Sequence, residues 1–261
     1  MGQGLAGATF GSGQKHPLIL IHGFPLDGRM WEGQEEALAV DRRVLVPDLR
    51  GFGRSPLPRE GHTIEDHARD IAEFMDAHAA PRGILCGFSM GGYVALAFAA
   101  FFPWRLSGLV LADTKAGSDL GQAREARTAS AQRVLGEGLT FLADDMLFKL
   151  LTEQTLASDE ELARRIWSLM VSQRREGVAS ALLAMRDRPD RTDQLARIDC
   201  PALVVVGNED VITPPCEAQK MAASLPKGCF REIPEAGHLS NMEQPFLFNG
   251  ALLDFMSALP D

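Results

Sequence analysis

The chain has 261 residues, of which 46% are hydrophobic and 23% charged, and its formal net charge is −9. This composition is typical of a globular protein and excludes disordered and collagen-like chains. The longest apolar run, Tyr93–Phe102, has ten residues, whereas about 18 are needed to cross a bilayer. The acidic charge argues against a nucleic-acid partner, which would require a basic face, and we expect no membrane partner.

The first residues contain no basic segment followed by an apolar one, so nothing predicts a secretion signal and we expect a cytoplasmic location. The four cysteines include no C-x-x-C pair and no Cys/His cluster with zinc spacing. We therefore expect neither disulfides nor a bound metal. Cys86 and Cys229 lie in apolar, strand-like runs, where burial is expected.

Short apolar runs alternate with amphipathic segments along most of the chain. The runs that predict strands are residues 18–21, 44–46, 84–86, 109–112, 202–206 and 230–233. The helical patterns are residues 31–40, a helix capped by Thr63, residues 90–102 up to Pro103, a helix after Pro215, and a last helix ending near Leu259. Apolar strands separated by helices predict an α/β fold with a mostly parallel central sheet flanked by helices.

One region interrupts this alternation. Residues 115–188 contain no convincing strand and show only helical periodicity. We expect a helical cap inserted into a single core domain made of residues 1–114 and 189–261. Its apolar side chains either line a pocket or pack the cap onto the core, and packing is the favoured interpretation for each of Phe141, Leu142, Met146, Leu147, Trp167 and Met170.

The most informative motif is G-x-S-x-G at residues 87–91, between a predicted strand and a predicted helix. In this context the serine occupies a sharp, strained turn that lifts its hydroxyl above the sheet at a helix N-terminus. The flanking glycines fit because neighbouring chain leaves no room for a Cβ. Ser89 is therefore the candidate nucleophile.

A serine nucleophile needs a base that is held by a carboxylate. His238 and Asp210 each follow a predicted strand, so both should lie at the same edge of the sheet as Ser89. Adjacent loop residues point in different directions, so Glu209 and Asp210 cannot both serve. Asp113 also ends a predicted strand and stays an alternative acid.

The other acidic and histidine residues are interpreted as structural. Solvated or capping roles are expected for His16, His62, His67 and His78, and structural roles at loops or helix starts for Asp27 and Glu243. In the sequence HGFP at 22–25, the backbone N–H of Phe24 can converge with that of Met90 to form an oxyanion hole. We expect the His22 ring to brace this loop.

The substrate pocket is expected beside these loops, with Phe24, Met90, Val211 and Leu239 as its candidate lining residues. Their side chains are apolar, which fits a small uncharged acyl group. A dicarboxylate lactone would instead call for a convergent pair of basic residues, and the sequence places none.

Together, HGFP (22–25), DLRGFGRS (48–55), GFSMGG (87–92), GNED (207–210) and EAGH (235–238) resemble the α/β-hydrolase superfamily. Within it, the chain is similar to bacterial carboxylesterases of the enol-lactonase-like group. The resemblance implies a monomeric or homodimeric serine esterase that acts on small, short-chain esters without a cofactor. The alternatives are an enol-lactonase of aromatic-compound breakdown and a non-catalytic hydrolase-like ligand receptor.

The chain departs from this family at its start. Only a Gly-rich lead of 21 residues precedes His22, so the first antiparallel edge strand is expected to be shortened or missing. There is no G-K-[ST] phosphate loop, and no G-x-G-x-x-G follows a strand, which argues against nucleotide binding.

Overall fold

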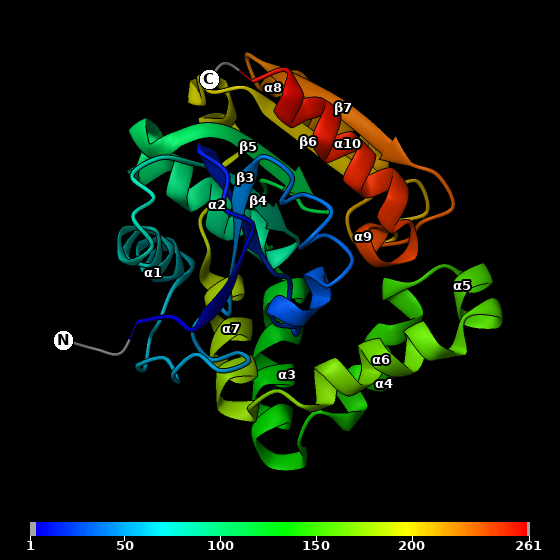
Figure 1. Cartoon of the computed structure of the whole chain (residues 1–261). Helices are drawn as coiled ribbons and strands as arrows, with labels where there is room; N and C mark the ends of the chain where they lie inside the picture. The colour runs from blue at the N-terminus through cyan, green and yellow to red at the C-terminus, as the bar shows by residue number, and fades with distance from the viewer. Residues whose placement is uncertain (1–3, 260–261) are drawn as a thin grey trace.

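The computed structural model of the chain describes residues 4–259. A seven-stranded sheet forms its centre, with the strand order β1-β3-β2-β4-β5-β6-β7 (Figure 1). The strands are β1 (Gly7–Phe10), β2 (Lys15–Ile21), β3 (Arg42–Pro47), β4 (Gly83–Phe88), β5 (Leu106–Ala112), β6 (Ala202–Gly207) and β7 (Gly228–Ile233). Only β1 pairs antiparallel, with β3, and every other pairing is parallel. The predicted mostly parallel sheet is confirmed.

Helices cover both faces of this sheet. They are α1 (Ile64–Ala77), α2 (Met90–Phe101), α8 (Pro215–Ser224), the short α9 (Ser240–Glu243) and α10 (Pro245–Ser257), with 3-10 helices η1 (Gly28–Trp31), η2 (Pro103–Arg105) and η3 (Thr192–Arg197). Successive strand residues point to opposite faces. Ile19 and Ile21 accordingly pack into one hydrophobic cluster with α1 and α2, whereas Leu18 and Leu20 pack into a second with α10. This two-sided burial explains why the central strands are continuously apolar.

The capping signal at Thr63 works as predicted. Its hydroxyl accepts a hydrogen bond from the Asp66 N–H, and the Asp66 carboxylate accepts one from the Thr63 N–H, which makes a capping box at the start of α1. At the other end, the ring Nδ1 of His78 lies 2.8 Å from the carbonyl oxygen of Phe74. Both ends of α1 are thus fixed by its own sequence.

The helical pattern at residues 31–40 gives only η1 and a series of turns. Side chains from α9 and α10 donate hydrogen bonds to backbone oxygens of this segment. Asn241 Nδ2 donates to the Met30 oxygen at 3.1 Å, and Asn249 Nδ2 donates to the Gly33 oxygen at 2.8 Å. These bonds compete with a continuing helix. Tertiary contacts therefore override the local periodicity.

The Gly-rich lead does contain an edge strand, the four-residue β1. A Cβ at Gly7 would lie 2.7 Å from the Phe74 ring, so the absence of a side chain lets β1 approach α1. At the opposite edge lies β7, and the expected burial of Cys229 there is wrong, because Cys229 is exposed. An edge strand has a neighbour on only one side, whereas the buried Cys86 lies on the central strand β4.

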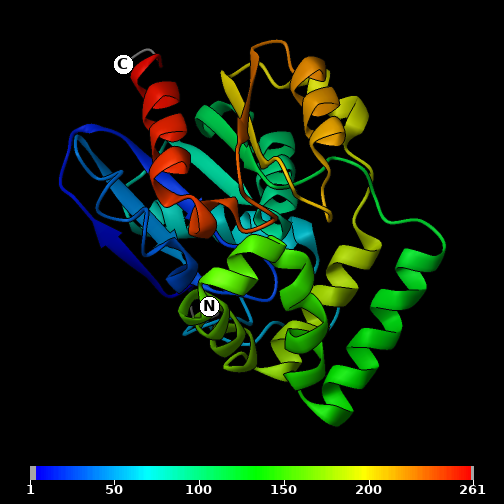
Figure 2. The ribbon, with the colours of Figure 1, turned by 90° about the vertical axis from the view of Figure 1, so that its right-hand side faces the viewer.

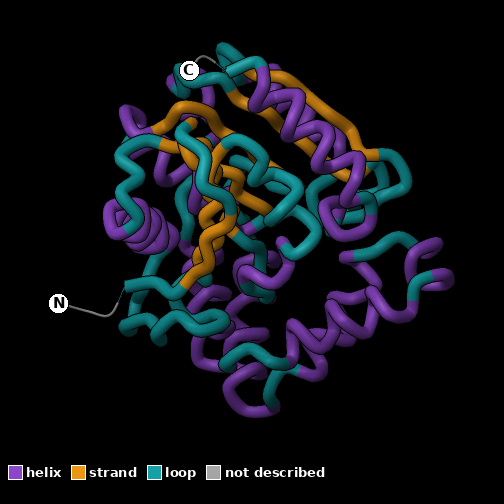
Figure 3. The backbone as a smooth tube through the Cα atoms, in the orientation of Figure 1, coloured by secondary structure: helices purple, strands orange, loops and turns teal. Residues whose placement is uncertain are grey.

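Between β5 and η3 the chain forms five α-helices, which we call the helical insertion. They are α3 (Gln122–Glu137), α4 (Thr140–Leu150), α5 (Glu153–Ser158), α6 (Glu160–Val171) and α7 (Arg175–Asp187). Residues 113–201, all of them described, contain no strand. The insertion lies at the bottom of Figures 1 and 2, with α3 packed on α7 and α4 on α6. Figure 3 shows the strands gathered away from it. Within the described residues, no helix has the length and apolar character needed to cross a bilayer.

The insertion meets the rest of the chain at a backbone-to-backbone contact. A Cβ on Gly177, in the first turn of α7, would overlap the carbonyl oxygen and carbon of Gly51. Gly51 itself has a φ of +94°, a conformation that side chains rarely adopt. A glycine at each position therefore allows α7 to dock directly on the loop at residues 48–55.

We predict that Gly177→Ala destabilises the protein by about 1–3 kcal/mol, because the added methyl group forces this contact apart. Gly136→Ala is the matched control, since Gly136 lies in α3 and no atom lies within 4 Å of the place that its Cβ would take. It should stabilise by about 0.5–1 kcal/mol through helix propensity. Chemical denaturation measures both, and equal effects of the two variants would contradict the close docking.

Candidate active site

Ser89 lies on a sharp turn between β4 and α2. Its φ is +51°, a conformation that costs about 1–3 kcal/mol for a residue with a side chain. A Cβ at Gly87 would overlap the carbonyl of Gly91, and one at Gly91 would overlap the carbonyl of Ile21. The two glycines thus permit the turn, and the Ser89 N–H is held by the Ala112 oxygen at 2.8 Å.

Three side chains that are distant in sequence meet here. The Nε2 of His238 lies 2.9 Å from Ser89 Oγ, and its Nδ1 lies 2.8 Å from Asp210 Oδ2. Because a carboxylate only accepts, the network places the proton on Nδ1 and leaves Nε2 to accept from the Ser89 hydroxyl. His238 and Asp210 are buried, whereas Ser89 is half-buried.

Asp210 is held by its own loop as well as by His238. Its Oδ1 accepts from the N–H groups of Ile212 at 2.8 Å and Thr213 at 2.9 Å, and its Oδ2 accepts from Thr213 Oγ1 at 2.5 Å. Burial alone would raise the pKa of Asp210, but its interaction with His238 and the bonds from Thr213 outweigh this effect and lower that pKa. Asp210 is therefore ionised at neutral pH. Glu209 is exposed to solvent.

Asp113 lies next to this group in a different environment. Its Oδ1 accepts from the Gly207 N–H at 2.9 Å and its Oδ2 from Ser240 Oγ at 2.5 Å. Burial, and then the negative charge of Asp210, raise the pKa of Asp113 well above its usual range. The pKa values of the two carboxyl groups are thus shifted in opposite directions. Asp210, whose pKa is lowered, is the one that bonds to His238.

The HGFP loop approaches the serine closely. A Cβ at Gly23 would lie 2.7 Å from the Phe88 ring and 3.3 Å from the Ser89 Cβ. Within residues 4–259, the N–H groups of Phe24 and Met90 donate to no carbonyl or side-chain oxygen. Neither N–H group therefore has a hydrogen-bond acceptor among the described residues.

The His22 ring braces the loop, as its position suggested. The Leu49 N–H donates to its Nε2 at 2.8 Å, so Nδ1 carries the proton and donates to the Gly23 oxygen at 3.0 Å. Burial is the largest influence on the pKa of His22 and lowers it. A neutral ring thus joins the loops at residues 22–25 and 48–55.

The four expected lining residues occupy different environments. Phe24 is largely buried and packs edge-on against Phe52. Met90 and Leu239 are fully buried in the two hydrophobic clusters, whereas Val211 is 69% exposed.

Sequence reasoning did not single out Thr213 or Ser240, although each donates to one of the two buried carboxyl groups. The turn around Asp210 had a detectable signal, because Asp side chains commonly accept from the backbone N–H two residues on, as Asp210 does from Ile212. Ser240 had none, since its partner Asp113 is 127 residues away. Glu243 has the structural role predicted for it, because its carboxylate accepts from the N–H groups of Gly237 and Thr152 at 2.7 and 2.8 Å.

A second polar cluster lies on α1. The predicted solvated or capping role is wrong for His67, which is buried at 2% exposure beside His62 and Asp70. Burial, and then His62, lower the pKa of His67 to about 3, so its ring is neutral. These three residues lie close enough to share a metal ion, but both oxygens of Asp70 already accept from the guanidinium of Arg50. That cation disfavours a divalent ion.

Asp113, Asp210 and His238 are the other group of described residues with metal-binding spacing. The hydrogen bonds given above already occupy their facing atoms. The arrangement instead provides a serine hydroxyl, a base that faces it and an ionised carboxylate behind the base, with two nearby N–H groups that have no acceptor among the described residues. These are the parts of an acyl-transfer site.

Comparison with known proteins agrees with this chemistry. Residues 16–245 match the family described as alpha/beta hydrolase fold. A 3-oxoadipate enol-lactonase of Acinetobacter baylyi is 31% identical, with 94% of this chain and 90% of that protein covered. A thermophilic esterase from Thermogutta terrifontis, solved with malate bound, is 43% identical with a TM-score of 0.94, covering 97% and 93% of the two chains. The enol-lactonase from Burkholderia xenovorans is 29% identical with a TM-score of 0.91, covering 97% and 96%.

The chain therefore belongs to the α/β-hydrolase family, and it is a hydrolase of the group that includes esterases and enol-lactonases.

Proposed function

We propose that the protein is a serine carboxylesterase that hydrolyses small, short-chain esters through an acyl-enzyme. The observation that carries this proposal is the continuous chain of hydrogen bonds from Ser89 through His238 to Asp210. The similarity to the esterase from Thermogutta terrifontis supports it.

In the first step His238 Nε2 takes the Ser89 proton while Oγ attacks the ester carbonyl carbon. The N–H groups of Phe24 and Met90 hold the resulting oxyanion, and Asp210 stabilises the imidazolium. His238 then protonates the leaving alcohol. Water, activated by the same imidazole, attacks the acyl-enzyme and releases the acid, which returns Ser89 to its starting state.

We further propose that the helical insertion, within residues 115–188, acts as a cap over this site. Its backbone reaches the histidine loop, because the Leu239 N–H donates to the Leu150 oxygen at 3.0 Å and Glu243 links Gly237 to Thr152. We therefore expect the cap to restrict the space beside the histidine, which would favour short acyl chains.

An enol-lactonase is the second candidate, favoured by the similarity to the Acinetobacter baylyi enzyme. A lactone that carries carboxylates would need free cations on the cap. Arg127 and Arg188, however, both pair with the buried Asp119, and Arg124 pairs with Asp187. These three arginines are therefore not free to bind a carboxylate, which supports an uncharged ester as the preferred substrate.

We predict that Ser89→Ala lowers kcat for p-nitrophenyl acetate by about 10⁴-fold or more, because the nucleophile is lost. Labelling of Ser89 by a fluorophosphonate in the folded wild-type protein is the companion measurement. A wild-type protein that neither hydrolyses esters nor takes the label would favour the non-catalytic ligand receptor instead.

Replacing the two buried carboxyl groups, Asp210 and Asp113, should lower kcat by very different amounts. Asp210→Asn should lower kcat by about 10⁴-fold, because the wrong imidazole tautomer is then favoured. Asp113→Asn, the matched variant, keeps that contact, and its loss of a hydrogen bond should cost about tenfold or less. The reverse order of effects in steady-state kinetics would make Asp113 the acid.

Substrate preference is tested with p-nitrophenyl esters whose acyl chains run from about 2 to about 12 carbons, and with an enol-lactone carrying a carboxylate. We expect kcat/KM to be highest for the shortest chains and to fall with length. A kcat/KM for the enol-lactone above that of every ester would replace the esterase proposal by the lactonase.

A further inference from the structure

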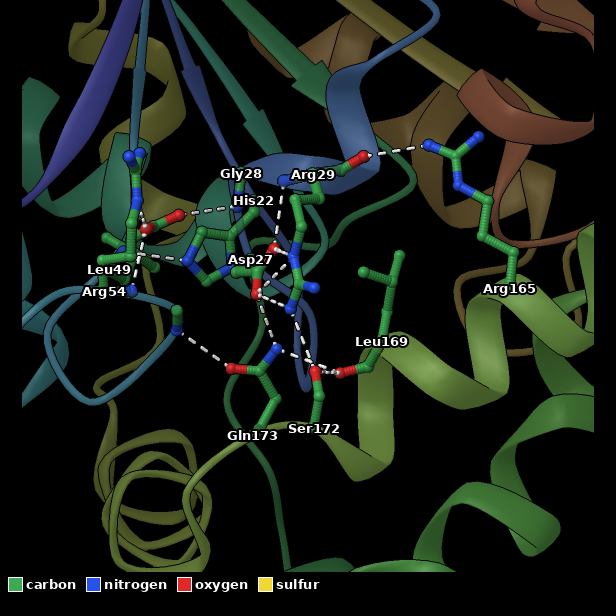
Figure 4. Close-up of polar contacts among 12 residues, drawn as sticks. His22, Asp27, Gly28, Arg29, Leu49, Arg54, Arg165, Leu169, Ser172 and Gln173 are labelled. Carbon is green, nitrogen blue, oxygen red and sulfur yellow. Dashed lines mark hydrogen bonds and ion pairs between the residues drawn. The ribbon is translucent and has the colours of Figure 1, made fainter.

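The corner between α6 and α7 reaches across to two loops of the core. Three consecutive residues there bond to these loops: Ser172 to Arg29, Gln173 to Asp27 and Gly53, and Arg174 to the Ser55 oxygen. Figure 4 shows the bonds of Ser172 and Gln173. Gln173 is the buried member of the three, at 7% exposure. Its side chain is the only one of the three that bonds to both loops among the described residues.

Both ends of the Gln173 amide have partners. Its Nε2 donates to Asp27 Oδ2 at 2.8 Å and to the Leu169 oxygen at 3.0 Å, and its Oε1 accepts from the Gly53 N–H at 3.0 Å. A buried amide with all these bonds has one orientation, because any rotation would leave a buried carboxylate or N–H without its partner. Gln173 is therefore a rigid link between the insertion and the core.

Asp27 carries this link to the HGFP loop. It is 1% exposed, and its Oδ1 accepts from the Arg29 N–H at 3.0 Å, which caps η1. Burial alone would raise the pKa of Asp27, but the hydrogen bonds from Arg29 and Gln173 outweigh it and hold that pKa below its usual range. The carboxylate is thus charged, and the Gln173 bond is of the stronger, charge-assisted kind.

The turn that carries Phe24 ends next to Asp27. The Leu26 N–H donates to the Gly23 oxygen at 3.0 Å, so residues 23–26 form a closed turn directly before Asp27. On the other side, the Gly28 N–H donates to Asp48 Oδ1 at 2.9 Å. The loop is therefore held from the core by Asp48 and from the insertion by Gln173.

We propose that Gln173 is a positioning residue, through which the helical insertion fixes the loop that presents the Phe24 N–H to the reacting carbonyl. This inference rests on the proposed function, because it takes Phe24 as an oxyanion donor. The insertion then does more than cover the site: it sets the position of one donor, and the barrier of the reaction depends on that position. The exposed contacts at this corner, such as Arg29 to Ser172, contribute less because solvent screens them.

The test compares Gln173→Met with Ile166→Val. Methionine keeps the length and packing of Gln173 but leaves Asp27 Oδ2 and the Gly53 N–H without their partner. Ile166 is fully buried in α6, the helix that ends just before Gln173, and its change to valine loosens the packing of that helix without touching Asp27. The two variants thus separate the link itself from a general loss of stability.

Two measurements are made on the full chain. Steady-state hydrolysis of p-nitrophenyl acetate should show kcat reduced about 10- to 100-fold in Gln173→Met with KM changed by less than about twofold, because the donor acts on charge that develops only in the transition state. The acid limb of the kcat/KM pH profile should stay in place, since the triad is untouched. Hydrogen–deuterium exchange of the peptide covering residues 22–31 should be at least about tenfold faster.

Unchanged kcat and unchanged exchange in Gln173→Met, or equal effects in Ile166→Val, would overturn the inference. A wild-type protein without esterase activity would overturn the proposed function alone. The exchange experiment would then still decide whether Gln173 holds the loop.

Discussion

Parallel strand pairing is the constraint on which the site depends. Because β2, β4, β5 and β6 run in one direction in adjacent positions, the residues that follow them emerge at a single edge of the sheet. His22, Ser89, Asp113 and Asp210 are such residues, and His238 follows β7 on the same edge. A register shift in any pair would move a group by a whole residue spacing, which is more than the tolerance of a hydrogen bond. The parallel sheet thus brings residues that are far apart in the sequence into contact at one edge.

Within that edge, neighbouring groups differ sharply in electrostatic environment. Asp210 has three donors from its own loop besides His238, whereas Asp113 is fully buried with two donors and lies beside the charge of Asp210. The pKa of Asp210 is lowered and that of Asp113 is raised, so the negative charge is favoured on Asp210 over Asp113. Two adjacent acids can share a buried site only under such a division.

The helical insertion contributes to this organisation at two places. Near His238, the Leu150 oxygen and the Glu243 carboxylate join it to the loop after β7. Near Phe24, Gln173 joins the insertion to Asp27. The contact between Gly51 and Gly177 sets the distance between α7 and the loop at residues 48–55. The hydrogen bonds fix the orientation of the insertion relative to these loops, and the backbone contact fixes its distance from them. Together they hold the loops on both sides of Ser89.

Local patterns in the sequence were sufficient for most of the sheet and for the turn at Ser89, because apolar runs, the Thr63 cap and paired glycines act through near neighbours. The same patterns failed at residues 31–40, where Asn241 and Asn249 take the backbone oxygens from more than 200 positions away. They also failed at Cys229, because strand order rather than strand sequence decides which strand lies at an edge. The serine candidate could be inferred from its G-x-S-x-G motif, and the histidine and acid candidates from their positions after predicted strands. Which carboxyl faces the imidazole, and which residue of the helical insertion bonds to Asp27, depend on side-chain directions. Only the folded chain defines these directions, because they are set by partners that come together from distant parts of the sequence.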